Sequence, residues 1–277
     1  MQGVLYAPFN PAFGSQYELP VTALEACDRE IEPDLERRSL GFRTRVDQSA
    51  YVTEYAGFLD AVLAETSLPR FIASSEHIHA WLTTPELIAA LDGFLQGRFS
   101  QVEYLVYLRP QEELVTSAYS EAIRRGARHD FATHLARHGR INHWTALKRW
   151  LEVIGRDRIR VRLMARDALA GQDLIEDFCR VSGIESAGLG RPPRVNAALT
   201  RGEIALRRRL NTMLPVQSRS GRVHPLYALS LRLLRPFYAD DRHLRLSAEQ
   251  MTALQACNFE SNEKLRKRLF HHRSALF

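Results

Sequence analysis

The stretch VEYLVYLRPQEELVTSAYSEAI, residues 102–123, decides the fold. After Glu103 its first part is continuously apolar up to Leu108, which is typical of a strand buried on both faces. Residues 111–125 bring a set of apolar side chains to one face, which predicts an amphipathic helix. Arg109 and Pro110 form the turn between the two elements. A buried strand that passes directly into a helix indicates an α/β fold in which helices cover a parallel sheet.

The rest of the chain extends this pattern in both directions. Alternating or short apolar runs predict further strands at 3–9, 70–74 and 159–164, and period-3.6 patterns with capping residues predict helices at 47–66, 84–96, 131–137, 142–154 and 173–181. From Thr200 onward we expect helices only, in about three segments broken near Leu214 and Asp240. We therefore expect a single α/β domain over residues 1–277, with a parallel sheet flanked by helices and a helical C-terminal region.

Composition limits the class of protein. Hydrophobic residues make up 45% of the 277 residues and charged residues 25%, as in ordinary globular proteins. Cys27, Cys179 and Cys257 are distant from one another, which predicts buried free thiols and no disulfide framework. We find no apolar run of the ~18 residues that a membrane span needs, and no secretory signal pattern. We expect a cytoplasmic protein without a membrane span.

Charge is segregated along the chain. Residues 1–123 hold 8 basic and 18 acidic side chains, whereas residues 124–166 hold 12 and 3, and residues 191–235 hold 10 and 1. Two basic blocks of this kind favour a polyanionic partner such as a nucleotide phosphate or an anionic glycan, and a solvated basic face explains them equally well. No zinc-finger spacing or aromatic RNA-binding motif is present, so we expect no nucleic-acid partner.

The strand end at Arg109 predicts an anion site. In parallel sheets ligands bind beyond the carboxyl ends of the strands. A guanidinium at such an end can fork onto a phosphate that also receives a hydroxyl from the following helix. Arg109 and Ser117, eight residues apart across the turn, fit these roles. A surface arginine beside an acidic helix start is the competing interpretation, because Glu112 and Glu113 repel a phosphate.

This spacing resembles the 3′-phosphate-binding motif of sulfotransferases that use 3′-phosphoadenosine 5′-phosphosulfate. The sequence YLVYLRPQEELVTSAYSEAI, residues 104–123, is most similar to bacterial sulfotransferase-like proteins associated with cell-surface polysaccharides. Four further stretches agree with that group in order and spacing, namely FIASSE at 71–76, the segment 143–184 that begins HWTALKRW, RVNAALTRGEIALRRRLN at 194–211, and FESNEKLRKRLFHHRSALF at 259–277. The resemblance covers residue 50 to the last residue and implies a P-loop-like sulfotransferase fold.

The chain departs from the family in one respect. The family opens with a strand and a loop of the type K-x-G-T-[ST], which binds the 5′-phosphosulfate and supplies a lysine. Here the early Gly14-Ser15 has no lysine beside it, and no lysine precedes Lys148. We expect the chain to lack the family's first strand-loop-helix unit, about 30 residues. The resemblance then implies weak donor binding, because the loop that binds the 5′-phosphosulfate is missing. It also implies marginal stability, because the missing strand is central in the family's sheet.

The remaining candidate residues follow from the chemistry of sulfuryl transfer. An in-line displacement needs a base near the acceptor hydroxyl. Glu76 and His77, at the end of the strand predicted at 70–74, are the catalytic candidates, with His79 as an alternative. A serine nucleophile is set aside because no G-x-S-x-G elbow surrounds Ser74.

Two further groups of residues, four histidines and five arginines, are candidates outside the motif. His129, His134, His138 and His143 have spacings that suggest a metal, but only Asp130 offers a carboxylate, so we expect no metal site. The basic residues Arg124, Arg125, Arg128, Arg191 and Arg194 are candidate contacts for donor phosphates or an anionic glycan, or part of a solvated face.

Two functions from different classes stay open. The first is a sulfotransferase that moves a sulfuryl group from 3′-phosphoadenosine 5′-phosphosulfate, as co-substrate, to a hydroxyl of a cell-surface carbohydrate. The second is a catalytically inactive remnant of that fold that binds an anion or glycan. A kinase of the P-loop type is disfavoured, because no Walker lysine or Mg²⁺-binding aspartate is visible.

Overall fold

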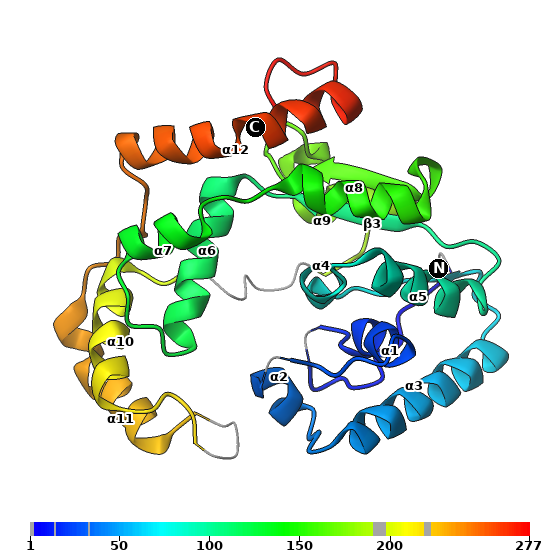
Figure 1. Cartoon of the computed structure of the whole chain (residues 1–277), viewed down its shortest axis with the longest axis horizontal. Coiled ribbons are helices and arrows are strands. Elements are labelled where there is room, and N and C mark those ends of the chain that lie inside the picture. The colour runs from blue at the N-terminus through cyan, green and yellow to red at the C-terminus, as the bar shows by residue number, and fades with distance from the viewer. Residues whose placement is uncertain (1–2, 14, 33, 191–197, 219–222) are drawn as a thin grey trace. The chain divides into compact units, whose positions relative to one another are not determined.

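The structure is a computed structural model that describes residues 3–13, 15–32, 34–190, 198–218 and 223–277. It is a mixed α/β fold, rich in helix (Figure 1). Contacts divide the chain into two compact units. Unit 1 comprises residues 1–106, 145–162 and 169–187, and unit 2 comprises residues 107–144, 163–168 and 188–277. No helix in the described parts of the chain is long and apolar enough to cross a membrane.

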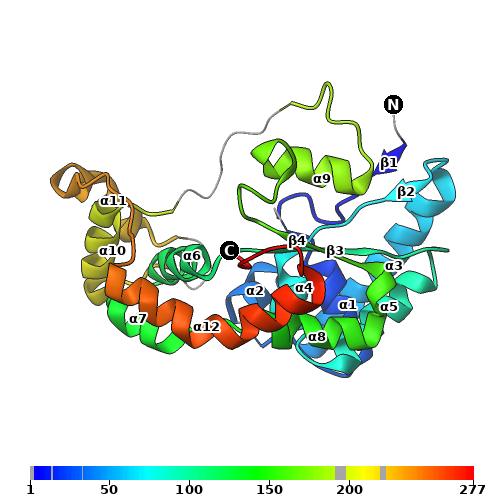
Figure 2. The same ribbon diagram turned by 90° about the horizontal axis from the view of Figure 1, so that it is seen from above.

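The strands form two small sheets (Figure 2). β1 (Val4–Leu5) runs parallel to β2 (Arg70–Phe71), with Val4 opposite Arg70. β3 (Tyr104–Leu108) pairs with β4 (Ile159–Leu163). Helices separate the paired strands in the sequence, so the expected class, parallel strands flanked by helices, is confirmed at this level. The strands expected at 3–9 and 70–74 are each only two residues long.

β3 differs from its prediction in burial. We expected a strand buried on both faces, but residues 104–107 are half-buried and only Leu108 is fully buried. A sheet of two strands explains the difference, because each strand keeps one edge without a ladder partner and its side chains are covered by fewer neighbours. The prediction of a fully enclosed strand was therefore wrong, whereas its position in the sequence was right.

Unit 1 is built around a helix that the sequence pattern missed. α1 (Glu18–Ala26) contacts both α3 (Arg45–Glu65) and α5 (Pro85–Gln96), and Figure 1 shows it beside them. The core contains Leu19, Val21, Leu59, Leu87, Ile88 and Leu91. The unit also holds α2 (Asp34–Ser39), α4 (Glu76–Trp81), η1 (Arg156–Arg158), η2 (Ala170–Gln172) and α9 (Leu174–Ser182), the last closed by left-handed Gly183.

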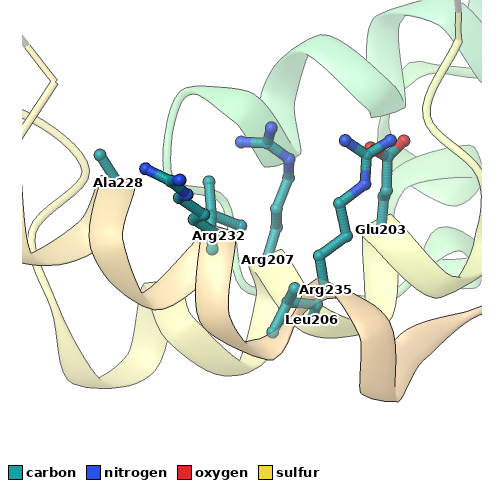
Figure 3. A pocket seen from close by; sticks show the side chains of 7 residues that line it. Glu203, Leu206, Arg207, Ala228, Arg232 and Arg235 are labelled. Carbon is teal, nitrogen blue, oxygen red and sulfur yellow. The ribbon is translucent and has the colours of Figure 1, made fainter.

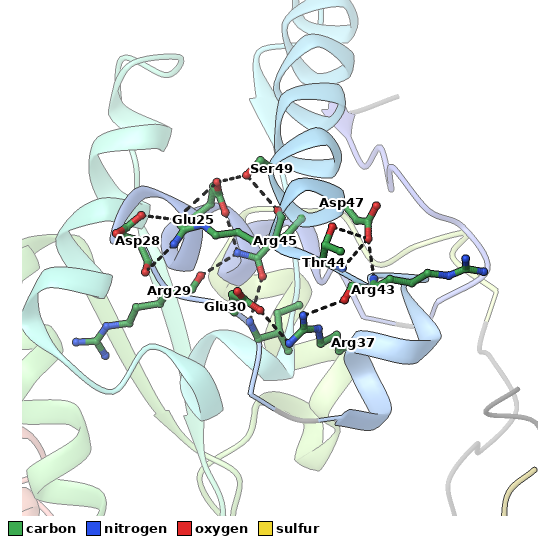
Figure 4. Close-up of polar contacts among 12 residues, drawn as sticks. Glu25, Asp28, Arg29, Glu30, Arg37, Arg43, Thr44, Arg45, Asp47 and Ser49 are labelled. Carbon is green, nitrogen blue, oxygen red and sulfur yellow. Dashed lines mark hydrogen bonds and ion pairs between the residues drawn. The ribbon is translucent and has the colours of Figure 1, made fainter. Parts of the chain in front are cut away.

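The start of α3 shows how local chemistry fixes a helix end (Figure 4). An Asp47 carboxylate oxygen accepts hydrogen bonds from the backbone N–H groups of Arg43 and Thr44, each at 2.7 Å. These bonds satisfy donors ahead of the helix and lower the pKa of Asp47. Nearby, Arg45 pairs with Asp28 at 2.5 Å. The helix predicted from residue 47 thus has its N-cap three residues earlier, at Thr44, and Asp47 completes the capping box from the first turn.

Two enclosed carboxylates hold the segment around β4. Asp92 on α5 accepts hydrogen bonds from the Arg158 guanidinium at 2.9 and 2.8 Å and from the Tyr104 hydroxyl at 2.9 Å. Despite its burial, these donors lower the pKa of Asp92. Asp177 on α9, fully buried, accepts from Arg162 and from a backbone N–H. Charge-assisted bonds of this kind tie unit 1 together across the sequence.

The described residues of unit 2 are mainly helical, with strand ends and two isolated β-bridges, Thr200 with His243 and Gln217 with Val223. It contains α6 (Gln111–Arg124), α7 (Phe131–His138), α10 (Arg201–Met213), α11 (Pro225–Leu234), η3 (Arg235–Tyr238) and α12 (Ala248–Leu269), and α8 (His143–Ile154) begins in it. α6 and α10 meet around Tyr119, Ile123, Leu199 and Ile204, and α10 meets α11 around Leu206, Leu210 and Tyr227. The three helical segments expected after Thr200 correspond to α10, α11 and α12.

The cysteines are free, as expected, but their burial differs from the prediction. Cys179 is buried, Cys27 is half-buried and Cys257 is exposed on α12. Cys257 lies at the edge of the buried side of α12 that carries Leu254 and Leu265, where its Sγ is 3.7 Å from the carbonyl oxygen of Gly139, and the residue remains exposed. The prediction of three buried thiols holds for Cys179 alone.

Candidate functional site

The strand-to-helix turn after β3 holds Arg109 by its backbone. Pro110 is the N-cap residue of α6, and its fixed φ sets the entry into the helix. The carbonyl oxygen of Arg109 accepts a hydrogen bond from Nε2 of buried His143, at 3.0 Å. A carbonyl can only accept, so Nε2 of His143 carries the proton. His143, at the start of α8, therefore positions the backbone of Arg109.

The Arg109 side chain lies along the first turns of α6. Its Nε donates to a carboxylate oxygen of Glu113 at 2.8 Å. Ser117 follows Glu113 by one helical turn, so residues 113 and 117 share the face of α6 along which the guanidinium lies. Ser117 is half-buried, and its hydroxyl has no hydrogen-bond partner among the described residues. The structure thus brings Arg109 and Ser117 to one face, with Glu113 between them.

The energetics of this face decide whether an anion can bind there. The Arg109 and Glu113 side chains are 35% and 48% exposed, and a surface ion pair of this kind contributes about 0–1 kcal/mol. Hydrogen bonds between a guanidinium and a phosphate or sulfate are charge-assisted and contribute roughly 1.5–3 kcal/mol. A dianionic phosphate can therefore displace Glu113. The carboxylate weakens binding at this site but does not block it.

Glu76 and His77 occupy the start of α4 in unit 1. We expected them at the end of the strand predicted at 70–74, but Ser75 caps a short helix here and accepts from the backbone N–H of His77 at 3.3 Å. Glu76 is exposed, and its carboxylate has no partner in the described part of the chain. A base must reach its substrate from solvent, and Glu76 meets this condition.

His77 is enclosed. It is 7% exposed, its ring lies 4.3 Å from the ring of Tyr17 and 4.8 Å from that of Trp81, and its Nδ1 is 3.0 Å from the Ser15 hydroxyl. This environment fixes the ring and leaves one nitrogen bound to a hydroxyl. Sequence reasoning missed Ser15, which lies 62 residues from its partner; the Gly14-Ser15 pair was the only signal, and Gly14 lies outside the described residues.

The four candidates form two groups. Glu76 and His77 belong to unit 1, and Arg109 and Ser117 belong to unit 2. The first group combines an exposed carboxylate with an enclosed histidine, and the second combines a half-buried arginine with a half-buried serine hydroxyl. Arg109 and Ser117 are close in sequence and are joined by the turn at Pro110 and the first part of α6, so they belong to one structural group.

The histidines that suggested a metal separate into a stack and a single residue. The His129 and His134 rings are parallel within 4° at 5.4 Å, with His129 Nε2 3.2 Å from His134 Nδ1, and His138 lies 4.6 Å from His134. Burial and the neighbouring His138 and His129 lower the pKa of His134 to about 4. Within the described ranges, no group of three or more His, Cys, Asp or Glu side chains is arranged to hold a metal ion.

The other basic candidates are only partly described. Arg124 and Arg125, at the end of α6, lie 3.6 and 3.0 Å from Glu121, which neutralises part of their charge. Arg191 and Arg194 lie outside the described residues. The residues that sequence reasoning missed at the Arg109 turn are Glu113 as a partner and His143 as an anchor. An i, i+4 pairing signal could have revealed the first, but no local signal marks the second.

Comparisons with family models, with curated proteins and with solved structures find no match to this chain.

Proposed function

We propose that this chain is a sulfotransferase-like protein that binds the 3′-phosphate of 3′-phosphoadenosine 5′-phosphosulfate through Arg109 and Ser117, and transfers its sulfuryl group to a carbohydrate hydroxyl. The observation that carries the proposal is the turn after β3, where a guanidinium and a half-buried hydroxyl without a partner share one face of α6. The mixed α/β class, with parallel strands and flanking helices, agrees with a P-loop-like fold.

The chemistry assigns a separate role to each group. In sulfuryl transfer the acceptor oxygen forms a bond to sulfur while the bond from sulfur to the phosphate oxygen breaks. The acceptor hydroxyl gives up its proton, and Glu76, as the exposed carboxylate, is the base that we propose for it. His77 is too enclosed to reach an acceptor in this structure, so its part is to hold the start of α4 through Tyr17, Trp81 and Ser15.

The second candidate function is a non-catalytic protein that binds an anionic nucleotide or glycan. One observation favours it: the first 147 residues contain no lysine, so the cation that the resembled family places near the bridging oxygen has no counterpart among them. Binding at Arg109 does not require that cation, whereas transfer does, because charge develops on the leaving phosphate. Separate measurements of donor binding and of sulfuryl transfer therefore distinguish the two candidate functions.

The first experiment is a thermal-shift titration of the chain with 3′-phosphoadenosine 5′-phosphate, with AMP as the ligand control. A ligand that binds only the folded state raises the melting temperature with its concentration. We expect a shift that depends on the 3′-phosphate. Arg109→Ala should weaken binding roughly ten- to a hundred-fold, the loss expected for a charge-assisted hydrogen bond. Ser117→Ala should weaken it less.

The matched control is Lys264→Ala, which removes a cation with a similar i, i+4 acidic partner, Glu260, from α12 in the same unit. It should leave the shift unchanged. Transfer of labelled sulfate from the donor to a hydroxyl-rich polysaccharide then distinguishes the candidates. Binding with transfer that Glu76→Gln removes supports the enzyme. Binding without transfer supports the anion-binding protein. Equal shifts with AMP, or an unchanged shift in Arg109→Ala, would overturn both.

A further inference from the structure

A basic pocket lies between α10 and α11 in unit 2, distant in sequence from Arg109 and Ser117. Its volume is about 320 Å³, and its lining includes Arg207 from α10, Arg232 from α11 and Arg235 from η3 (Figure 3). Leucine and alanine side chains form the rest, apart from Glu203. The volume is at the small end for ligand sites, which suits one charged group rather than a large molecule.

The pocket carries an excess of positive charge. Glu203 pairs with Arg235 at 3.3 Å, and Figure 3 shows these two side chains together. Arg207 and Arg232 have no carboxylate partner among the described residues. Nε of Arg207 is buried and has no hydrogen-bond partner in the described structure. A buried donor without an acceptor is costly, and a phosphate oxygen is the acceptor that a guanidinium binds best.

A ridge of exposed apolar side chains runs along the same helix. Leu226, Leu229 and Leu233 on α11 are 57%, 52% and 61% exposed, and Phe237 on η3 is 80% exposed. Their spacing of three, four and four residues puts them on one side of α11. α11 contains no acidic residue. Exposed apolar side chains that line up in this way mark an interaction surface rather than scattered surface residues.

The ridge and the pocket adjoin. Tyr227 and Leu231 face α10, where Tyr227 is fully buried, so the ridge is on the outer side of α11. Arg232 follows Leu229 by three residues and precedes Leu233 by one, which places it at the border between pocket and ridge. α11 therefore has a buried face, a cationic edge and an apolar outer face.

We propose that α11 and η3 dock on a membrane of anionic phospholipids, with the leucine ridge and Phe237 among the lipids and the pocket arginines on headgroup phosphate. This inference goes beyond the proposed function and does not depend on it. Apolar residues flanked by arginines are the composition of helices that lie in the membrane interface. A second copy of the chain would place arginines against arginines, and a free phosphate would fill the pocket but leave the ridge in water.

The test is sedimentation of the full chain with vesicles of phosphatidylcholine alone and of phosphatidylcholine with phosphatidylglycerol. We expect binding to the anionic vesicles only, weakened by salt because exposed charges are screened. Arg232→Gln with Arg235→Gln should lower the partition coefficient roughly 25-fold, about fivefold for each cation at an anionic surface. Leu229→Ser with Leu233→Ser should remove binding. All four positions are exposed, so the variants should fold, which their melting curves check.

Matched controls come from the same unit. Arg245→Gln changes an exposed arginine and Phe259→Ser an apolar residue that is 65% exposed on α12; both should bind vesicles like the parent chain. Brominated lipid should quench the fluorescence of the tryptophan introduced by Phe237→Trp. It should not quench the fluorescence of the tryptophan introduced by Phe259→Trp. Three results would overturn the proposal: no preference for anionic vesicles, binding that the leucine variants retain, or a dimer in solution that those variants abolish. Tight binding of inorganic phosphate with no vesicle binding would assign the pocket to a free anion instead.

Discussion

Acidification should destabilise unit 2 through one histidine. His134 is only 3% exposed, its ring is stacked on that of His129 and tilted by 42° to that of His138, and its Nε2 is buried without a hydrogen-bond partner among the described residues. Burial disfavours the charged form, and the neighbouring His138 and His129 add repulsion, so its pKa falls to about 4 in the folded chain. In the unfolded chain the pKa of a histidine is about 6.5.

The sign of the effect follows from proton linkage. Between pH 6.5 and pH 4 the unfolded chain binds more protons at this residue than the folded chain, so stability is complete above pH 6.5 and falls as the pH drops. Each pH unit within the window changes the free energy of unfolding by about 1.4 kcal/mol. From pH 7 to pH 5 the loss from His134 is therefore about 2 kcal/mol.

The assay is urea denaturation followed by far-ultraviolet circular dichroism at pH 7, 6 and 5. His134→Phe removes the titrating group and keeps an aromatic ring beside Tyr119 and Phe131. We expect this variant to lose about 2 kcal/mol less than the parent chain between pH 7 and pH 5. His138→Phe, at an exposed position, is the control and should retain most of the parent's loss. Parallel pH profiles for the parent and His134→Phe would refute the argument.

Three further predictions concern unfolding free energies, measured by urea denaturation at pH 7. Asp92→Asn should destabilise unit 1 by about 2 kcal/mol, because Arg158 loses its carboxylate partner. The loss is smaller than for a fully buried pair, because the Arg158 side chain is 31% exposed. The adjacent Gly93→Ala has open space around the new methyl group and should stabilise α5 by about 0.5–1 kcal/mol; destabilisation would contradict the open geometry. Gly202→Ala places a Cβ against the carbonyl oxygen of Tyr238 and should cost about 1–3 kcal/mol; an unchanged stability would contradict this packing.

Capping residues and apolar spacing predicted several helices, whereas the prediction failed where contacts distant in sequence replace these local signals. α3, α5 and α6 begin and end within a few residues of their expected limits. α1 was missed because it carries a proline in its first turn and has no side-chain cap. Its Glu18 is 2% exposed and accepts from the backbone N–H of Phe9 at 3.1 Å. A polar residue buried by a distant partner has no pattern in the local sequence.

The candidate site shows the same division between local and distant information. The strand, the turn and the helix that carry Arg109 and Ser117 are contiguous, so their spacing alone predicted a shared face. The hydrogen bond from His143 to the Arg109 carbonyl joins residues 34 positions apart, and no motif connects them. A backbone carbonyl that needs a donor does not reveal in sequence which side chain will supply it.

Glu113 offers the sharpest test of what Arg109 does. If Arg109 binds a 3′-phosphate, the carboxylate competes with the ligand for the guanidinium, so Glu113→Gln should tighten binding of 3′-phosphoadenosine 5′-phosphate several-fold and leave AMP unaffected. If Arg109 only ties the turn to α6, the same change removes a surface ion pair, which lowers the free energy of unfolding by at most about 1 kcal/mol and leaves affinity unchanged. Isothermal titration beside a melting curve separates these outcomes. Glu121→Gln, which frees Arg125 on the same helix, is the control for a general gain of positive charge. Equal tightening in both variants would show that the net charge of α6, and not Arg109, governs the affinity.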